Sequence, residues 1–138
     1  MKEETGCMIK VTIYKAKKPL LDRCPDPADT QQERSVYYGF DVEGHANFLA
    51  EGQDIVCAAV SMLVINTINS IERLTDDETS VVQDEDAARI RFRFANFAGH
   101  DAHLLVHSMI LGLEDIENDC ISHDSKFHSY IDIIFKEV

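Results

Sequence analysis

The residues best suited to chemistry in this chain are a histidine and a cysteine that lie within one short segment. His45 stands between Gly44 and Ala46, twelve positions before Cys57. Cys57 lies near the start of an apolar run that predicts a helix, where backbone N–H groups are free and the helix dipole is positive. Both features favour the thiolate form of a cysteine. The spacing therefore indicates a thiol nucleophile and its base, provided that the loop after His45 folds back onto the helix.

Local features alone leave simpler interpretations open for each of these residues. A helical cysteine is often a small buried side chain, and a loop histidine is often exposed and without a task. Asp54 could orient the His45 imidazole, but capping the helix is the better local interpretation, because a carboxylate near Cys57 opposes thiolate formation. Ser61 lies four positions after Cys57 on the same helix face, where it could form a hydrogen bond or only permit close packing.

The same segment resembles the signature of a known family. It reads G-H-A at positions 44–46, has a glycine at position 52, and reads D-I-V-C-A-A-V-S at positions 54–61. This is similar to the ribosomal-processing cysteine proteases (Prp), bacterial enzymes that trim the N-terminal extension of a large-subunit ribosomal protein. The resemblance implies that His45 and Cys57 are the catalytic pair and that Gly44, Asp54 and Ser61 support them. It also implies a homodimer, no cofactor, and a substrate extension that ends in aromatic residues before the cut.

Length and charge narrow the class of protein and of partner. A chain of 138 residues fits one domain, which we assign to residues 1–138. With 13 basic and 25 acidic residues the net charge is −12, which disfavours direct nucleic-acid binding. A basic ribosomal protein that carries an N-terminal extension fits better as a partner.

The sequence also predicts a cytoplasmic protein with no membrane partner. No N-terminal signal is visible, and the apolar run from Ile55 to Ile65 is far shorter than the roughly 20 residues that a membrane span needs. The four cysteines show no paired spacing and are interpreted as free thiols of a reducing compartment; they are Cys7, Cys24, Cys57 and Cys120.

Hydrophobic periodicity predicts an α/β (α+β) two-layer sandwich. Alternating residues predict strands over 9–15, 36–43, 89–94 and 130–135, and apolar stripes predict helices from Asp54 to about Leu74 and over about 102–118. The order β-β-α-β-α-β, with one charged sheet face, predicts a four-stranded mixed sheet with both helices on the other face. Residues 75–86, which are rich in acids, are expected to form a solvated loop. Relative to the family, residues 1–7 are an N-terminal extension and residues 18–35 a loop insertion.

Three arginines share the outward face of the predicted strand over 89–94: Arg89, Arg91 and Arg93. They could form a patch for an acidic ligand, or they could pair with outward acids on neighbouring strands, such as Asp41, Glu43 or Asp132. We favour pairing, because the sheet lacks the aromatic stacking residues of a nucleic-acid surface.

A second polar pattern comprises His100, His103 and His107, of which the last two have the i, i+4 spacing of a metal-binding pair. The alternative is a solvated helix face. We favour that alternative and predict no metal site, because no cysteine and no H-E-x-x-H pattern completes a ligand set.

The sequence thus predicts a cysteine endopeptidase that acts on a ribosomal protein. The competing hypotheses are a non-catalytic dimeric assembly factor or chaperone that binds the same basic protein, and a thiol-based redox sensor.

Overall fold

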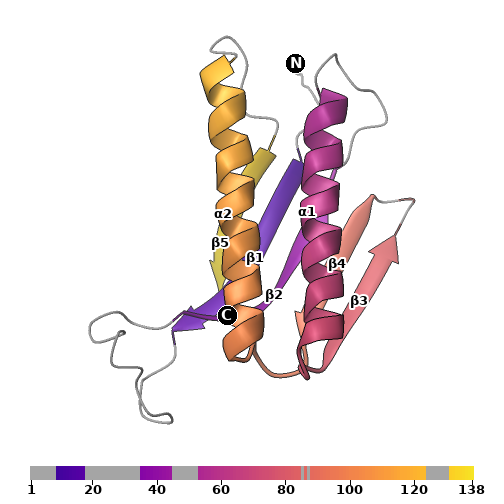
Figure 1. Cartoon of the computed structure of the whole chain (residues 1–138), viewed down its shortest axis with the longest axis vertical. Coiled ribbons are helices and arrows are strands. Elements are labelled where there is room, and N and C mark those ends of the chain that lie inside the picture. The colour runs from indigo at the N-terminus through magenta and orange to yellow at the C-terminus, as the bar shows by residue number, and fades with distance from the viewer. Residues whose placement is uncertain (1–8, 18–34, 45–52, 85, 87, 124–130) are drawn as a thin grey trace.

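The computed structural model describes residues 9–17, 35–44, 53–84, 86, 88–123 and 131–138. The elements are β1 (Ile9–Lys17), β2 (Ser35–Glu43), α1 (Gln53–Leu74), β3 (Thr79–Asp84), β4 (Arg89–Phe94), α2 (His100–His123) and β5 (Ile131–Glu137). The sheet has the order β3-β4-β2-β1-β5, in which β1 and β5 are parallel and the other neighbours antiparallel. Both helices lie on one face of it and run in opposite directions (Figure 1). The predicted two-layer arrangement with a mixed sheet is confirmed.

The sheet has five strands in the described part of the chain, so the predicted four-stranded sheet was wrong. The additional strand, β3, lies inside the segment 75–86 that was expected to be a solvated loop. Acids at both ends of this segment dominate its composition. In addition, β3 is an edge strand whose residues after Thr79 are all exposed, so it lacks the alternation that marks a half-buried strand. The element order is therefore β-β-α-β-β-α-β.

The second helix is longer than predicted at both ends, since α2 runs from His100 to His123 rather than over 102–118. Its start is fixed from a distant part of the chain. The Asp77 carboxylate accepts a hydrogen bond of 2.7 Å from the Gly99 N–H, and the His103 N–H donates to the Gly99 carbonyl at 2.8 Å. A carboxylate near the positive N-terminal end of a helix is stabilising. The sequence around position 100 does not reveal that this carboxylate comes from Asp77, which is distant in sequence.

The core lies between the helices and the sheet, mostly as the sequence predicted. Its fully buried side chains come from all of the layers described; the largest are Phe40, Phe92, Ile13, Ile71, Met109, Leu113 and Ile131. At the centre the Phe40 and Phe92 rings stack with their centroids 4.8 Å apart.

A bulge interrupts the pairing of β1 with β2. The register shifts between Tyr14 and Lys15, so that Lys15 pairs with Tyr37 and Tyr38 has no partner across β1. A bulge reverses the side-chain alternation beyond it. As a result Tyr37, rather than Tyr38, is buried in the core.

Helix α1 is apolar around most of its surface. Val60, Val64, Ile68 and Ile71 are buried against the rest of the fold, whereas Ile55 and Met62 are 74% and 67% exposed. The stretch from Ile55 to Leu74 is long and apolar enough to cross a membrane by length and composition, a test that core helices of other proteins also pass. The predicted run was shorter because it stopped at Ile65. The expectation of no membrane partner stays a prediction.

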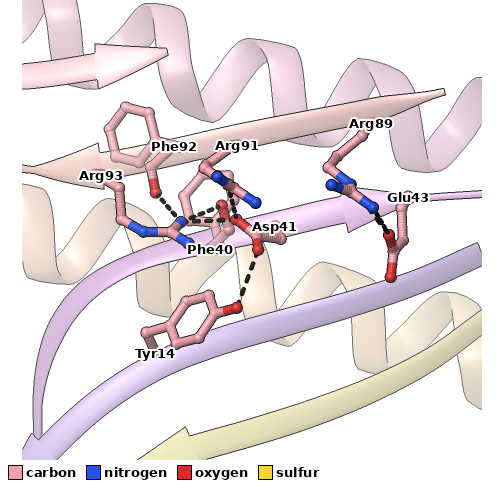
Figure 2. Close-up of polar contacts among 8 residues, drawn as sticks. All are labelled: Tyr14, Phe40, Asp41, Glu43, Arg89, Arg91, Phe92 and Arg93. Carbon is pink, nitrogen blue, oxygen red and sulfur yellow. Dashed lines mark hydrogen bonds and ion pairs between the residues drawn. The ribbon is translucent and has the colours of Figure 1, made fainter. Parts of the chain in front are cut away.

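The open face of the sheet carries the three arginines, and the predicted cross-strand pairing is confirmed for Asp41 and Glu43 (Figure 2). Arg93 Nη1 lies 2.7 Å from Asp41 Oδ1, and Arg91 Nε lies 3.8 Å from the same oxygen. Arg89 Nη2 lies 3.1 Å from Glu43 Oε2. The three arginines of β4 therefore pair with two carboxylates of β2, because Arg91 and Arg93 share Asp41.

Asp41 is the hub of this face. The Tyr14 hydroxyl donates to its other oxygen at 2.9 Å, and the Arg93 guanidinium lies over the Tyr14 ring, 4.4 Å from the ring centroid. Burial, and next the hydrogen bond to Asp41, raise the pKa of Tyr14 above 10.0. Gly39 makes room for Arg93, because a Cβ at position 39 would lie 3.0 Å from Arg93 Cδ and would collide with the Phe92 carbonyl oxygen.

Candidate active site

The histidine of the predicted pair follows a glycine whose backbone only glycine adopts easily. Gly44 has a φ of 90°, a region that side chains disfavour. Its N–H donates to the Ala88 carbonyl at 3.0 Å, which fastens the end of β2 to the turn before β4. Gly44 thus follows the last residue of β2, Glu43, and directly precedes His45 in the sequence. His45 itself lies outside the described residues, so its position relative to Cys57 is a prediction.

Cys57 lies on α1 close to the helix start. Its side chain is half-buried, packs against the edge of the hydrophobic core, and forms no disulfide with a described residue. It is the only cysteine whose side chain lies in the described part of the chain. A half-buried thiol on the first turns of a helix is compatible with both earlier interpretations, a nucleophile or a small packed side chain.

Helix α1 begins at Gln53, one residue earlier than predicted. Asp54 therefore lies within the first turn of the helix. Its side chain lies outside the described residues, so its capping role stays a prediction. The apolar stripe locates the buried face of a helix, whereas backbone hydrogen bonding sets its first residue. The N–H groups of residues 53–55, at the start of the helix, have no intrahelical partner, and Cys57 follows them by two positions. These are the candidate donors for an oxyanion.

An open pocket lies one helical turn beyond Cys57. Ser61 and Val64 line it from α1, Val42 from the end of β2, and the β3–β4 hairpin supplies the remaining wall: Gln83, Asp84, Ala88, Arg89 and Ile90. Ser61 is four positions after Cys57, and Val42 is two positions before Gly44. The pocket therefore brings together the flanks of the two predicted catalytic segments, although they are separate in sequence.

The hairpin wall of this pocket is the feature that sequence reasoning missed. Once β3 was interpreted as a loop, Gln83 and Asp84 had no assigned place. A signal was present in Thr79, Val81 and Val82, residue types that favour strands, but the surrounding acids outweighed it. Ala88, which has a positive φ of 51°, also gave no sign of the turn.

The predicted solvated histidine face of α2 is confirmed for His100 and His107, which are exposed, whereas His103 is half-buried. The Tyr37 hydroxyl and His107 Nδ1 lie 3.1 Å apart, and the His103 ring centroid lies 4.8 Å from that of Tyr37. They cover the polar end of a buried tyrosine whose pKa is raised by burial and by the nearby Glu114 carboxylate. Among the residues that the structure describes, no three His, Cys, Asp or Glu side chains lie close enough to hold a metal ion. The absence of a cofactor stays a prediction.

Comparison with known proteins decides the family. The family model described as cysteine protease Prp matches residues 28–123. The chain belongs to the Prp cysteine protease family. The resemblance stated from the His45 to Ser61 segment is thereby confirmed, and the protease is favoured over the non-catalytic assembly factor.

Relatives and solved structures agree with this assignment. The chain is 38% identical over 84 residues to the ribosomal processing cysteine protease Prp of Bacillus subtilis, covering 58% of this chain and 75% of that protein. It is 28% identical over 78 residues to the Prp of Staphylococcus aureus, covering 56% of this chain and 74% of that protein. The crystal structure of the S. aureus protease with a substrate peptide has a TM-score of 0.67 at 21% identity, covering 94% of this chain and all of that one. SMU.848 from Streptococcus mutans has a TM-score of 0.62 at 24% identity, covering 94% and 99%. The structural likenesses show that the Prp fold is shared.

Proposed function

We propose that this Prp-family protease is a cytoplasmic endopeptidase that removes the N-terminal extension of a large-subunit ribosomal protein. Membership of the family carries the proposal, together with the name of the 38% identical relative, a ribosomal processing protease. The net charge of −12 supports it, because an acidic enzyme attracts a basic substrate over long range.

In the proposed mechanism Cys57 attacks the carbonyl carbon of the scissile bond. The oxyanion that forms accepts hydrogen bonds from N–H groups in the first turn of α1. Before the attack His45 takes the proton of the Cys57 thiol and stabilises the thiolate. It then protonates the leaving amine, after which water hydrolyses the thioester. Gly44 directs the chain that carries His45, Asp54 orients the imidazole, and Ser61 shapes the pocket beside the thiol.

The proposal is tested by mass spectrometry of a purified ribosomal protein that carries its N-terminal extension, after incubation with the enzyme. We expect one shortened product. Cys57→Ala and His45→Ala should each lower the cleavage rate by several orders of magnitude, as removal of a nucleophile or its base usually does. Cys24→Ala is the matched control, because it removes a thiol elsewhere in the chain. Normal cleavage by Cys57→Ala, or equal loss in Cys24→Ala, contradicts the assignment.

We further propose a homodimer that forms through the outer faces of the helices. The two helices form the layer that faces the viewer in Figure 1, and each carries large apolar side chains that are exposed to solvent. They are Ile55, Met62 and Ile65 on α1, and Leu104 and Leu111 on α2. Exposed apolar patches of this kind mark protein interfaces.

The dimer proposal predicts that Met62→Asp yields a monomer, as measured by sedimentation equilibrium. Val138→Asp places the same charge on an apolar side chain of equal exposure, 67%, at the end of β5, where the Val138 N–H donates to the Lys15 carbonyl of the sheet, and it should leave the mass unchanged. A monomeric parent protein, or an unchanged mass for Met62→Asp, refutes the proposed interface.

A further inference from the structure

The strand β3 has an open hydrogen-bonding edge. In the described part of the chain β3 is a terminal strand of the sheet, with β4 as its neighbour. The Ala95 N–H donates to the Glu78 carbonyl at 2.8 Å, which makes these two residues a hydrogen-bonded pair at the start of the ladder. Because such pairs alternate in an antiparallel ladder, the register of β3 on β4 assigns the N–H and C=O groups of Thr79, Val81 and Gln83 to the open edge.

This edge ends at the candidate active site. Gln83 and Asp84, the last residues of β3, line the same pocket as Ser61, one helical turn from Cys57. A chain paired with β3 would therefore extend toward the pocket. The other terminal strand, β5, contributes no residue to that pocket.

The side chains of β3 suit a second strand that lies beside it. Val81 and Val82 point to opposite faces of the sheet and are 38% and 59% exposed. They offer apolar contact to alternate side chains of a neighbouring strand on both faces. Proteins usually protect an edge of this kind with lysine, proline or a bulge. The sequence from Thr79 to Asp84 has no lysine or proline, and the register of β3 on β4 runs from Thr79 to Asp84 without a shift.

The acidic residues around the β3 edge favour binding of a positively charged chain. The sequence from Thr75 to Asp86 contains six acids and no basic residue. Asp76, Glu78 and Asp86 are exposed around the two ends of β3. An extended chain with basic side chains therefore matches this edge, whereas an acidic chain would be repelled.

We propose that the open edge of β3 binds an extended, basic segment of the substrate polypeptide as an added strand and leads it to the pocket beside Ser61. The inference rests on the proposed function for the identity of the polypeptide. Addition of a strand to a sheet edge provides affinity through main-chain hydrogen bonds and specificity through alternate side chains.

The test uses the Cys57→Ala protein and a synthetic peptide that spans the junction between the extension and the mature ribosomal protein. Binding is followed by amide hydrogen exchange with NMR detection. We expect the peptide to slow exchange at Val81 and Gln83, whose N–H groups face the open edge, much more than at Val82, whose N–H faces β4. Binding that leaves the amides of β3 unchanged, or no binding at all, overturns the proposal.

Two variants make the test sharper. Val81→Pro removes one edge N–H and keeps the bonds to β4, as proline in an edge strand allows. It should weaken peptide binding about three- to tenfold, the contribution of one backbone hydrogen bond. If Val81→Pro does not fold, Glu78→Lys carries the same test through charge and should weaken binding several-fold at low salt. Glu137→Lys, an equal charge change at the opposite edge, should not; equal effects of Glu78→Lys and Glu137→Lys refute the proposal.

The outcome is separable from that of the proposed function. If the parent enzyme cleaves its substrate but the peptide does not protect the amides of β3, the docking proposal is refuted and the proposed protease activity stands. Protection of β3 without cleavage by the parent enzyme leaves the docking edge and removes the proposed processing activity.

Discussion

Two carboxylates on the same face of the sheet provide a matched test of how burial governs an ion pair. Asp41 has a side chain only 13% exposed and contacts Arg93 at 2.7 Å, whereas Glu43 is 36% exposed and its partner Arg89 is 42% exposed. The substitutions Asp41→Asn and Glu43→Gln remove one charge each and keep the shape of the side chain. The two variants therefore differ mainly in the environment of the lost charge.

The expected magnitudes differ clearly. An exposed pair contributes about 0–1 kcal/mol, so Glu43→Gln should lower the free energy of unfolding by less than about 1 kcal/mol. A hydrogen bond to a charged group contributes about 1.5–3 kcal/mol. Asp41 accepts two hydrogen bonds, from Arg93 and from Tyr14, and asparagine keeps one oxygen as an acceptor. We therefore expect Asp41→Asn to cost about 2–3 kcal/mol.

Urea unfolding at neutral pH, followed by circular dichroism, measures both free energies. Ultraviolet titration of tyrosine gives a second readout. Burial is the largest cause of the raised pKa of Tyr14, and the hydrogen bond to Asp41 and the Asp41 charge raise this pKa further. In Asp41→Asn this pKa should fall toward 10.0, and in Glu43→Gln it should not move. Equal losses of stability in the two variants, or an unchanged tyrosine titration in Asp41→Asn, would refute the reasoning.

Three further substitutions test the fold and its pH dependence. Gly39→Ala should lower the free energy of unfolding by more than about 2 kcal/mol in urea denaturation, because its Cβ collides with the Phe92 carbonyl oxygen. Gly44→Ala should cost about 1–2 kcal/mol through its positive φ, and should also lower the cleavage rate of any substrate; an unchanged rate contradicts its proposed role. Burial, then the Asp132 and Glu114 carboxylates, raise the pKa of Glu117 above 4.5, so this group stabilises the fold at low pH and the contribution is lost as pH rises through the raised pKa. Glu117→Gln should therefore unfold at a higher temperature than the parent at pH 7, and this advantage should shrink below pH 4.5; the same difference at both pH values contradicts the assignment.

The sequence was sufficient for the parts of the fold that are half-buried. Ile9, Val11 and Ile13, and likewise Phe92 and Phe94, alternate with polar residues because one face of their strands meets the helices, and all five are buried. The two helices were found for the same reason. The protein family was also predictable from the sequence, because the residues that identify it lie in one continuous segment from Gly44 to Ser61.

The remaining features depend on contacts between distant segments. Strand β3 is exposed on both faces, so burial leaves no periodicity in its sequence. Tyr37 is buried in place of Tyr38 because the pairing of β2 with β1 shifts register between Tyr14 and Lys15. Helix α2 starts where it does because the Gly99 N–H donates a hydrogen bond to the Asp77 carboxylate. The pocket combines α1, β2 and the hairpin, and no single stretch of sequence encodes such a combination.

The pairing of β1 with β5 has a consequence for how the protein folds. These strands come from opposite ends of the described chain, with Ile9 beside Ile131, and Ile131 is fully buried in the core. During synthesis the ribosome releases β1 long before β5, so the nascent chain cannot close its sheet until β5 has emerged. Pairings between segments so far apart in sequence form slowly, because their loop entropy is lost before contacts compensate for it. We therefore expect the proteolytic activity to appear only after translation has passed β5. The nascent protease would then be inactive while it is still attached to the ribosome, which also synthesises its substrates.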